Sequence, residues 1–242
     1  MTLTNQRYPI VSIITVVFNG SKTLRATIES IVPHLGDNVE YIVIDGGSTD
    51  GTREIIKEYA SYLTYWVSES DLGIYDAMNK GISQANGDFC LFVGSDDEII
   101  PLGFKKAQSL MTEFSCVYYG QVLKDGKPVG CRINKLKILR DNIPHQAIFY
   151  PKSVYKNNFY RLQYKICADH EYNIRLIYSK IKFKYMDFSI CKFGSHGVSS
   201  LNADLDFARD YFDIVKNNAG TAISLLLRIS KLVKRILVKF KI

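Results

Sequence analysis

The sequence predicts an α/β protein built on a doubly wound, mostly parallel sheet. Short apolar runs of strand length alternate with stretches of helical periodicity, and this βαβ alternation is typical of parallel strands. The runs are apolar throughout, as in strands that are buried on both faces. With 242 residues, of which 47% are hydrophobic, the chain is long and apolar enough to bury a substantial core.

Each element is marked by its own local signal. Apolar runs predict strands over residues 11–18, 41–44, 65–67 and 89–93. A helix is expected after the first strand, with Ser21 as N-cap and an apolar face that ends near Pro33 and Gly36. Further helices are expected around 55–59 and over 74–85. Strands and crossovers at this spacing place successive strand ends along one edge of the sheet.

Two adjacent carboxylates, Asp96 and Asp97, follow the 89–93 strand. In open α/β sheets, ligands bind just outside the carboxyl ends of such strands. Carboxylate oxygens there suit Mg²⁺ or Mn²⁺, and magnesium is commonly held by one or two carboxylates plus substrate phosphates. A second interpretation is a capping box, with Ser95 as N-cap and Glu98 three residues later.

The loop over 45–52 follows the second strand and contains three glycines, which let a backbone approach a ligand closely. Asp45 directly after the strand can accept hydrogen bonds from a base or a ribose. The loop is neither G-x-G-x-x-G nor a phosphate-binding loop with its Lys-Ser/Thr. The alternative is a strand-to-helix turn in which Ser48 or Asp50 only caps the next helix.

The formal charge of +7 lies entirely near the C-terminus. Seven bases and no acids follow Asp213, and removing those seven from the 31 bases leaves 24 bases against 24 acids in residues 1–213. A body without net charge lacks the surface that nucleic-acid binding requires. At about 100° per residue, the tail forms a basic amphipathic helix. Its apolar side comprises Leu225, Leu226, Ile229, Leu232, Val233, Ile236, Leu237 and Phe240, and its basic side comprises Arg228, Lys231, Arg235 and Lys239.

Such a helix favours contact with an anionic membrane surface through residues 222–242. The alternative is a helix that docks its apolar face on the preceding domain. The five cysteines are widely spaced and contain no C-x-x-C pair, which is typical of reduced cytosolic thiols. The apolar run at 10–18 is too short to span a bilayer and fits a strand better than a signal peptide. We therefore expect a cytoplasmic protein on the inner face of the cell membrane.

Taken together, five blocks in order resemble the family 2 glycosyltransferases, which have the GT-A fold. These blocks are residues 11–19, 43–52, 70–82, 85–88 and 93–97. Thinner likeness to the acceptor-side blocks of the family covers 144–150, 168–172 and 193–199. Within the family, the chain is similar to enzymes that build bacterial surface polysaccharides, including colanic-acid-type transferases.

The resemblance implies roles for individual residues. Asp97 matches the metal-binding acid, Asp96 faces the donor ribose or sugar, and Asp169 matches the catalytic base, with His145, His170 and Glu171 as alternatives. The nucleotide side comprises Asp45 for the base, Thr15 and Val17 in the strand that lines the base pocket, and Asp71 near the nucleotide. Ser95 stands where the metal motif begins with an acid.

The resemblance implies an inverting, Mn²⁺- or Mg²⁺-dependent transfer of one sugar from a nucleotide-diphosphate sugar to a saccharide or lipid-linked saccharide acceptor. Residues 1–213 would form one GT-A catalytic domain, with 1–100 as the donor half and 101–213 as the acceptor half. Residues 214–242 would form the tail. Because Ser95 replaces an acid, a membrane-bound scaffold without activity is the alternative. A sugar nucleotidyltransferase would need a basic, glycine-rich loop after the first strand, which residues 18–21 do not provide.

Overall fold

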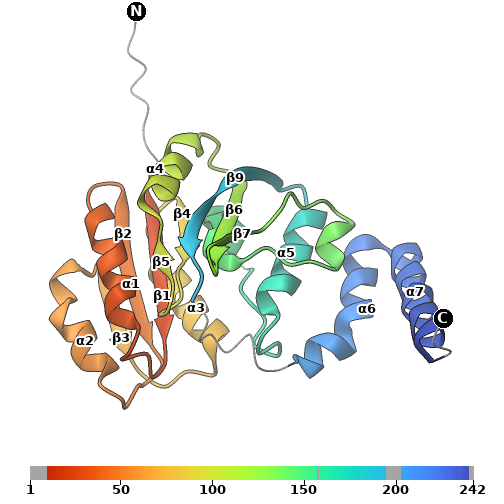
Figure 1. Ribbon diagram of the computed structural model, residues 1–242, viewed down its shortest axis with the longest axis horizontal. Coiled ribbons are helices and arrows are strands. Elements are labelled where there is room, and N and C mark those ends of the chain that lie inside the picture. Colours follow the sequence, from red (N-terminus) through yellow and green to blue (C-terminus); the bar gives the residue numbers. More distant parts are fainter. Residues whose placement is uncertain (1–9, 157, 195–202, 240–242) are drawn as a thin grey trace, which may run out of the picture.

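The computed structural model describes residues 10–156, 158–194 and 203–239, with side chains up to residue 232. Nine strands form one sheet in the order β3-β2-β1-β4-β8-β6-β9-β5, with β7 paired to β6 (Figure 1). The first four strands in this order are all parallel, as predicted. They are β1 (Val11–Val17), β2 (Val39–Asp45), β3 (Tyr65–Ser68) and β4 (Phe89–Phe92).

The second half of the sheet is mixed, which the parallel pattern did not predict. β8 (Ile148–Pro151) runs antiparallel to both β4 and β6 (Cys116–Lys124), so it joins the two halves. β6 pairs in parallel with β9 (Lys182–Lys192) and antiparallel with β7 (Lys127–Val129). β9 then pairs antiparallel with the two-residue strand β5 (Glu98–Ile99).

Helices cover both faces of the sheet. Successive β1 side chains alternate between two cores: Val11 and Ile13 pack with α1 (Leu24–Ile31) and α4 (Pro101–Leu110), whereas Ile14 packs with α3 (Ile74–Gln84) and α5 (Ala168–Tyr178). α2 (Thr52–Glu58) adds Ile56 to the first core. This alternation follows from the two-residue repeat of a strand and confirms a sheet that is buried on both sides.

Two local predictions are wrong. Ser21 lies in a turn that the Gly20 carbonyl closes by accepting from the Thr23 (3.1 Å) and Leu24 (2.9 Å) amides, and α1 begins at Leu24 with Thr23 at its N-cap position. No helix starts at Ser95 either: the Asp97 amide donates to the Gly94 carbonyl (3.1 Å) and closes a turn. Since Glu98 already belongs to β5 and α4 begins at Pro101, the capping box does not form.

The chain ends in two helices at the opposite side of the molecule from α1 and α2 (Figure 1). They are α6 (Leu205–Ala219) and α7 (Thr221–Lys239). The expected boundary at 213/214 follows the charge pattern but falls inside α6, and the helices separate instead at Gly220, where φ is +96°. No described helix is both long and apolar enough to cross a bilayer. All five cysteines are unpaired, as predicted.

Candidate active site

Two loops meet at the carboxyl edge of the parallel strands. The β1–α1 loop offers backbone amides to side chains of the β2–α2 loop: Asn19 N donates to Ser48 Oγ (2.7 Å) and Gly20 N to Thr52 Oγ1 (2.9 Å). In return, Thr49 N donates to Asn19 Oδ1 (3.0 Å). The hydroxyl and carboxyl groups of the 45–52 motif therefore fix the two loops to each other, which is more than a helix cap would do.

Asp45 is the centre of this loop and is fully buried. Its carboxylate accepts hydrogen bonds from the Ser48 amide (3.1 Å) and the Ser48 hydroxyl, and from Ser68 Oγ (2.5 Å). A carboxylate has about four acceptor positions, so most of its capacity is used within the protein. Direct contact with a base, as the sequence predicts, requires Ser48 or Ser68 to turn away.

The predicted β1 residues lie inside the protein. Thr15 is fully buried and its hydroxyl accepts from Tyr41 Oη (3.1 Å), while Val17 packs in the core with α1. In contrast, Phe18, the first residue after β1, is 66% exposed. Sequence reasoning missed Phe18 as a candidate because it reads as the last apolar residue of the strand. Thr15 and Val17 therefore support this edge of the sheet from inside the core, whereas Phe18 is exposed enough to contact a ligand.

Asp71 reaches the same edge from the β3–α3 loop. Its Oδ1 accepts from the Gly73 amide (2.8 Å). A Cβ placed on Gly46 would lie 2.5 Å from Asp71 Oδ2, so the glycine at position 46 is needed for this approach. The structure thus brings Asp71 beside the Asp45 loop.

Asp96 and Asp97 follow β4 but occupy different environments. Asp97 is only 1% exposed; its Oδ2 accepts from the Gly94 amide (2.9 Å) and its Oδ1 from the Gly194 amide (2.8 Å). Burial raises the pKa of Asp97 above its usual value, and the Gly194 amide and nearby His145 oppose that rise. Asp96 is partly exposed. Asp97 therefore anchors the turn, and Asp96 is the more open carboxylate.

Asp169 lies in the first turn of α5, in the half of the chain that the sequence predicts to bind the acceptor. Its Oδ2 accepts from Asn142 Nδ2 (2.9 Å), and its Oδ1 accepts from the His170 amide (2.8 Å) and lies 2.9 Å from Tyr75 Oη. Tyr75 Oη also lies 2.6 Å from the Ile166 carbonyl, so its single proton serves one acceptor at a time. Burial alone would raise the pKa of Asp169, but His145 and Tyr75 hold it below its usual value. Asp169 is therefore ionised at neutral pH.

His145 connects the two acidic centres. It precedes β8 in a short 3₁₀ turn, and its Nδ1 lies 3.7 Å from Asp169 Oδ2. When protonated, its imidazolium also lowers the pKa of the Asp97 carboxyl. His145 therefore acts on two carboxylates, Asp97 and Asp169, that are 72 residues apart in sequence. From sequence, His145 is only an alternative base and Asn142 is not a candidate, because their contacts with Asp169 depend on how β8 joins the sheet.

The other two alternative bases are engaged elsewhere. His170 Nε2 lies 2.6 Å from the Ile138 carbonyl, and its ring stacks on Phe207. Glu171 is fully buried and pairs with Arg175 (2.9 Å) and Arg161 (3.2 Å). Both side chains therefore bind α5 to its surroundings. The predicted block at 193–199 contributes Gly194, and its residues 195–199 lie outside the described residues.

The structure thus combines a Rossmann-like parallel half, carboxylates at the ends of β2 and β4, and the buried Asp169 carboxylate at the start of α5, which His145 approaches. This architecture is that of the GT-A glycosyltransferases. The chain belongs to glycosyl transferase family 2, whose family model matches residues 12–186.

Proteins of similar sequence support this membership. The chain is 30% identical over 213 residues to a "PGL/p-HBAD biosynthesis glycosyltransferase" of Mycobacterium bovis, with 83% of each chain covered. It is 31% identical over 130 residues to a "putative teichuronic acid biosynthesis glycosyltransferase" of Bacillus subtilis, covering 50% of this chain and 51% of that one. These names fit enzymes of glycolipid or polysaccharide synthesis and support a colanic-acid-type resemblance only loosely.

Solved structures show the same fold. Staphylococcus aureus TarS in complex with UDP-GlcNAc matches with a TM-score of 0.71 and 19% identity, over 87% of this chain and 65% of that one. A mannosyltransferase from Pyrobaculum calidifontis in complex with GDP-Man and Mn²⁺ matches with a TM-score of 0.62 and 13% identity, over 94% and 81% of the two chains.

Proposed function

We propose that this glycosyltransferase moves one sugar from a nucleotide-diphosphate sugar to a saccharide or lipid-linked saccharide acceptor, with inversion at the anomeric carbon, during surface polysaccharide synthesis. The observation that carries the proposal is the placement of His145, whose Nδ1 lies 3.7 Å from Asp169 Oδ2 and whose protonated form lowers the pKa of the Asp97 carboxyl. A donor bound at the end of β4 would therefore present its sugar toward the α5 carboxylate.

Asp169 is the proposed general base. Its lowered pKa keeps it ionised, and 6% of its surface remains exposed. The acceptor oxygen attacks the anomeric carbon on the face opposite the leaving group, and its proton passes to Asp169. The bond between the anomeric carbon and the diphosphate oxygen breaks, and that electron pair leaves with the nucleotide diphosphate. One carboxylate suffices because no covalent intermediate forms.

The donor set at the end of β4 fits Mg²⁺ or Mn²⁺. Within the described residues, no three His, Cys, Asp or Glu side chains converge into a complete metal cage. Two carboxylates completed by substrate phosphates would hold such an ion, which would supply a Lewis acid for the departing diphosphate. The sequence predicts Asp97 as the ligand, but its oxygens face the Gly94 and Gly194 amides. Asp96 is the more exposed of the two and is therefore better placed to present an oxygen to an ion from solvent, with Asp97 holding the turn that carries it.

The nucleotide lies, in this proposal, over the edge formed by Asp45, Asp71 and Phe18. Phe18 offers an exposed ring on which a base can stack. Asp71 accepts a hydrogen bond from the base or ribose, and Asp45 does so when Ser48 or Ser68 turns away from its carboxylate. Acceptors that are lipid-linked would bring the enzyme to the inner face of the cell membrane, with contact through residues 222–242.

The proposal is tested with the full chain and radiolabelled UDP-, GDP- and dTDP-sugars, in Mn²⁺ and then in EDTA, with product stereochemistry read by NMR. Asp169→Asn should slow transfer by roughly two to four decades, the usual scale of general base catalysis. Its matched control is Asp125→Asn in the β6–β7 turn, where φ of +49° suits asparagine equally well. Normal transfer by the Asp169 variant would reject the base assignment. No transfer or donor hydrolysis with any donor would favour the scaffold alternative.

A further inference from the structure

The last described helix leaves one apolar strip of its surface exposed over residues 225–232. α7 rests on α6 through Ser224, which is buried and donates from Oγ to the Phe212 carbonyl (2.8 Å). Four large apolar side chains are each at least half exposed. They form the α7 stripe, which comprises Leu225, Leu226, Ile229 and Leu232. At about 100° per residue, the stripe spans an arc of about 120° that excludes Ser224.

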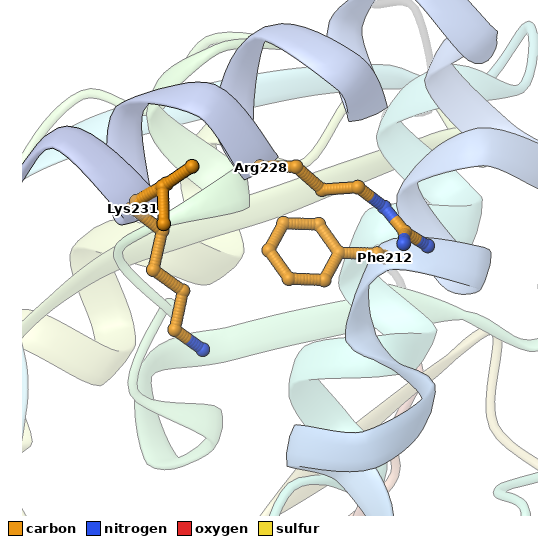
Figure 2. A pocket seen from close by; sticks show the side chains of 4 residues that line it. Phe212, Arg228 and Lys231 are labelled. Atoms are coloured by element: carbon orange, nitrogen blue, oxygen red, sulfur yellow. The ribbon is translucent and has the colours of Figure 1, made fainter. Parts of the chain in front are cut away.

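Basic side chains lie on the α6 side of the same helix. The Arg228 guanidinium carbon is 4.7 Å and Lys231 Nζ is 5.5 Å from the centre of the Phe212 ring. Figure 2 shows both side chains reaching past this ring, beside a hollow of about 230 Å³ that Leu232 also lines. The sequence left open whether the apolar face docks on the domain. In the described residues the contact with α6 and the core uses Ser224 together with the partly buried Ile223 and Leu227, whereas the four residues of the α7 stripe stay exposed.

The charge around the stripe indicates what covers it. Seven bases and no acids follow Asp213 in sequence, and Asp213 itself lies 3.7 Å from Arg228. A helix is about 10 Å across, so cations on its far side remain within roughly a Debye length of a surface that touches the stripe. An apolar stripe backed by cations complements a layer of acyl chains beneath anionic headgroups.

We propose that α7 lies flat on an anionic lipid surface, with the stripe among the upper acyl chains and the cations at headgroup level. α6 then holds the catalytic domain on the water side of α7. This inference deepens the proposed function. It rests on that function only for the reason why the enzyme would bind lipid, which is a lipid-linked acceptor. The binding itself requires neither donor nor acceptor.

Flotation of the full chain with phosphatidylcholine vesicles, with and without phosphatidylglycerol, tests the proposal. Wild type should float with the anionic vesicles and less so in high salt. The double variant Leu226→Glu/Ile229→Glu should lower the bound fraction about tenfold or more, since two apolar anchors become charged. Leu226→Ala/Ile229→Ala removes apolar area, keeps helix propensity and should bind at an intermediate level. The matched control, Leu102→Glu/Leu110→Glu, changes two exposed leucines of α4 and should float like wild type.

Several results would overturn the inference. One is unchanged flotation of the Leu226/Ile229 glutamate variant while its circular dichroism and melting match wild type. Another is equal binding to neutral and anionic vesicles. A third is a wild-type protein that does not bind vesicles and is a dimer by light scattering, while the glutamate variant is a monomer. The stripe would then join two copies of the chain. Transfer to a soluble acceptor by the glutamate variant should equal wild type, so loss of lipid binding and failure of the proposed activity are read separately.

Discussion

Gly194 offers a sharp test of how the end of β4 is held. An added Cβ would lie 2.3 Å from the Asp96 carbonyl oxygen and 2.5 Å from its Cγ, whereas ordinary contact begins near 3.4 Å. Gly194→Ala therefore requires a displacement of about 1 Å. Because the Gly194 amide donates to Asp97 (2.8 Å), that displacement reaches both carboxylates.

A displacement of this size can cost about 100-fold in rate, which corresponds to about 2.7 kcal/mol in transition-state binding. Overpacking should also lower the free energy of unfolding by about 1–3 kcal/mol, and so the melting temperature by a few degrees. We expect kcat/KM for sugar transfer to fall roughly 100-fold. Steady-state kinetics and thermal unfolding measure the two effects separately.

Gly126→Ala is the control for backbone strain. Its φ of +73° disfavours alanine, but nothing lies within 4 Å of the added methyl group. This variant should lose about 1–2 kcal/mol of stability and keep normal transfer. If Gly194→Ala also keeps kcat/KM within threefold of wild type, Asp96 and Asp97 are not held in catalytic positions by this contact.

Two further predictions separate the roles of the acidic groups. Asp97→Asn should lower both the melting temperature and the rate of transfer. The amide side chain cannot accept from both the Gly94 and Gly194 amides, and the lost hydrogen bond should lower the free energy of unfolding by about 1–3 kcal/mol. Asp96→Asn should abolish metal-dependent transfer with little change in melting; equal melting losses in the two variants would contradict the distinction. Tyr75→Phe removes a group that lowers the pKa of Asp169, so this pKa rises. Since the base acts when ionised, the acidic limb of the pH profile of kcat/KM should move to higher pH, and an unmoved limb would mean that Tyr75 donates to Ile166 instead.

The parallel half of the fold could be predicted from sequence because each of its elements carries a local signal. The runs at 11–18, 41–44, 65–67 and 89–93 all became neighbouring strands. The mixed half could not, because strands such as β6 and β9 pair across nearly seventy residues and polar positions interrupt their apolar pattern. The capping box failed for a related reason. Asp97 closes a turn before β5, and β5 exists only because β9 pairs with it.

In the candidate site, too, local features could be predicted from sequence and long-range contacts could not. Asp45, Asp96 and Asp97 follow strands, so sequence could place them on one edge of the sheet. What fixes each carboxylate could not be predicted. The Gly194 amide reaches Asp97 across 97 residues of sequence, and Asn142 reaches Asp169 from a segment without periodicity. These long-range donors decide whether a carboxylate is held within the protein or can present an oxygen to a ligand.

The hydrogen bonds between the β1–α1 and β2–α2 loops also bear on how nucleotide preference can change. Hydrogen bonds of Asn19, Ser48 and Thr52 hold the two loop backbones together before any ligand arrives. The entropy cost of ordering these loops therefore falls on folding and does not weaken ligand binding. The side chains of Phe18 and Thr49 are exposed and take no part in these hydrogen bonds between the loops, so they are not needed to keep the backbone in place. Relatives could therefore diverge in the base they accept through exchanges at such positions, with the fold and the reacting groups left intact.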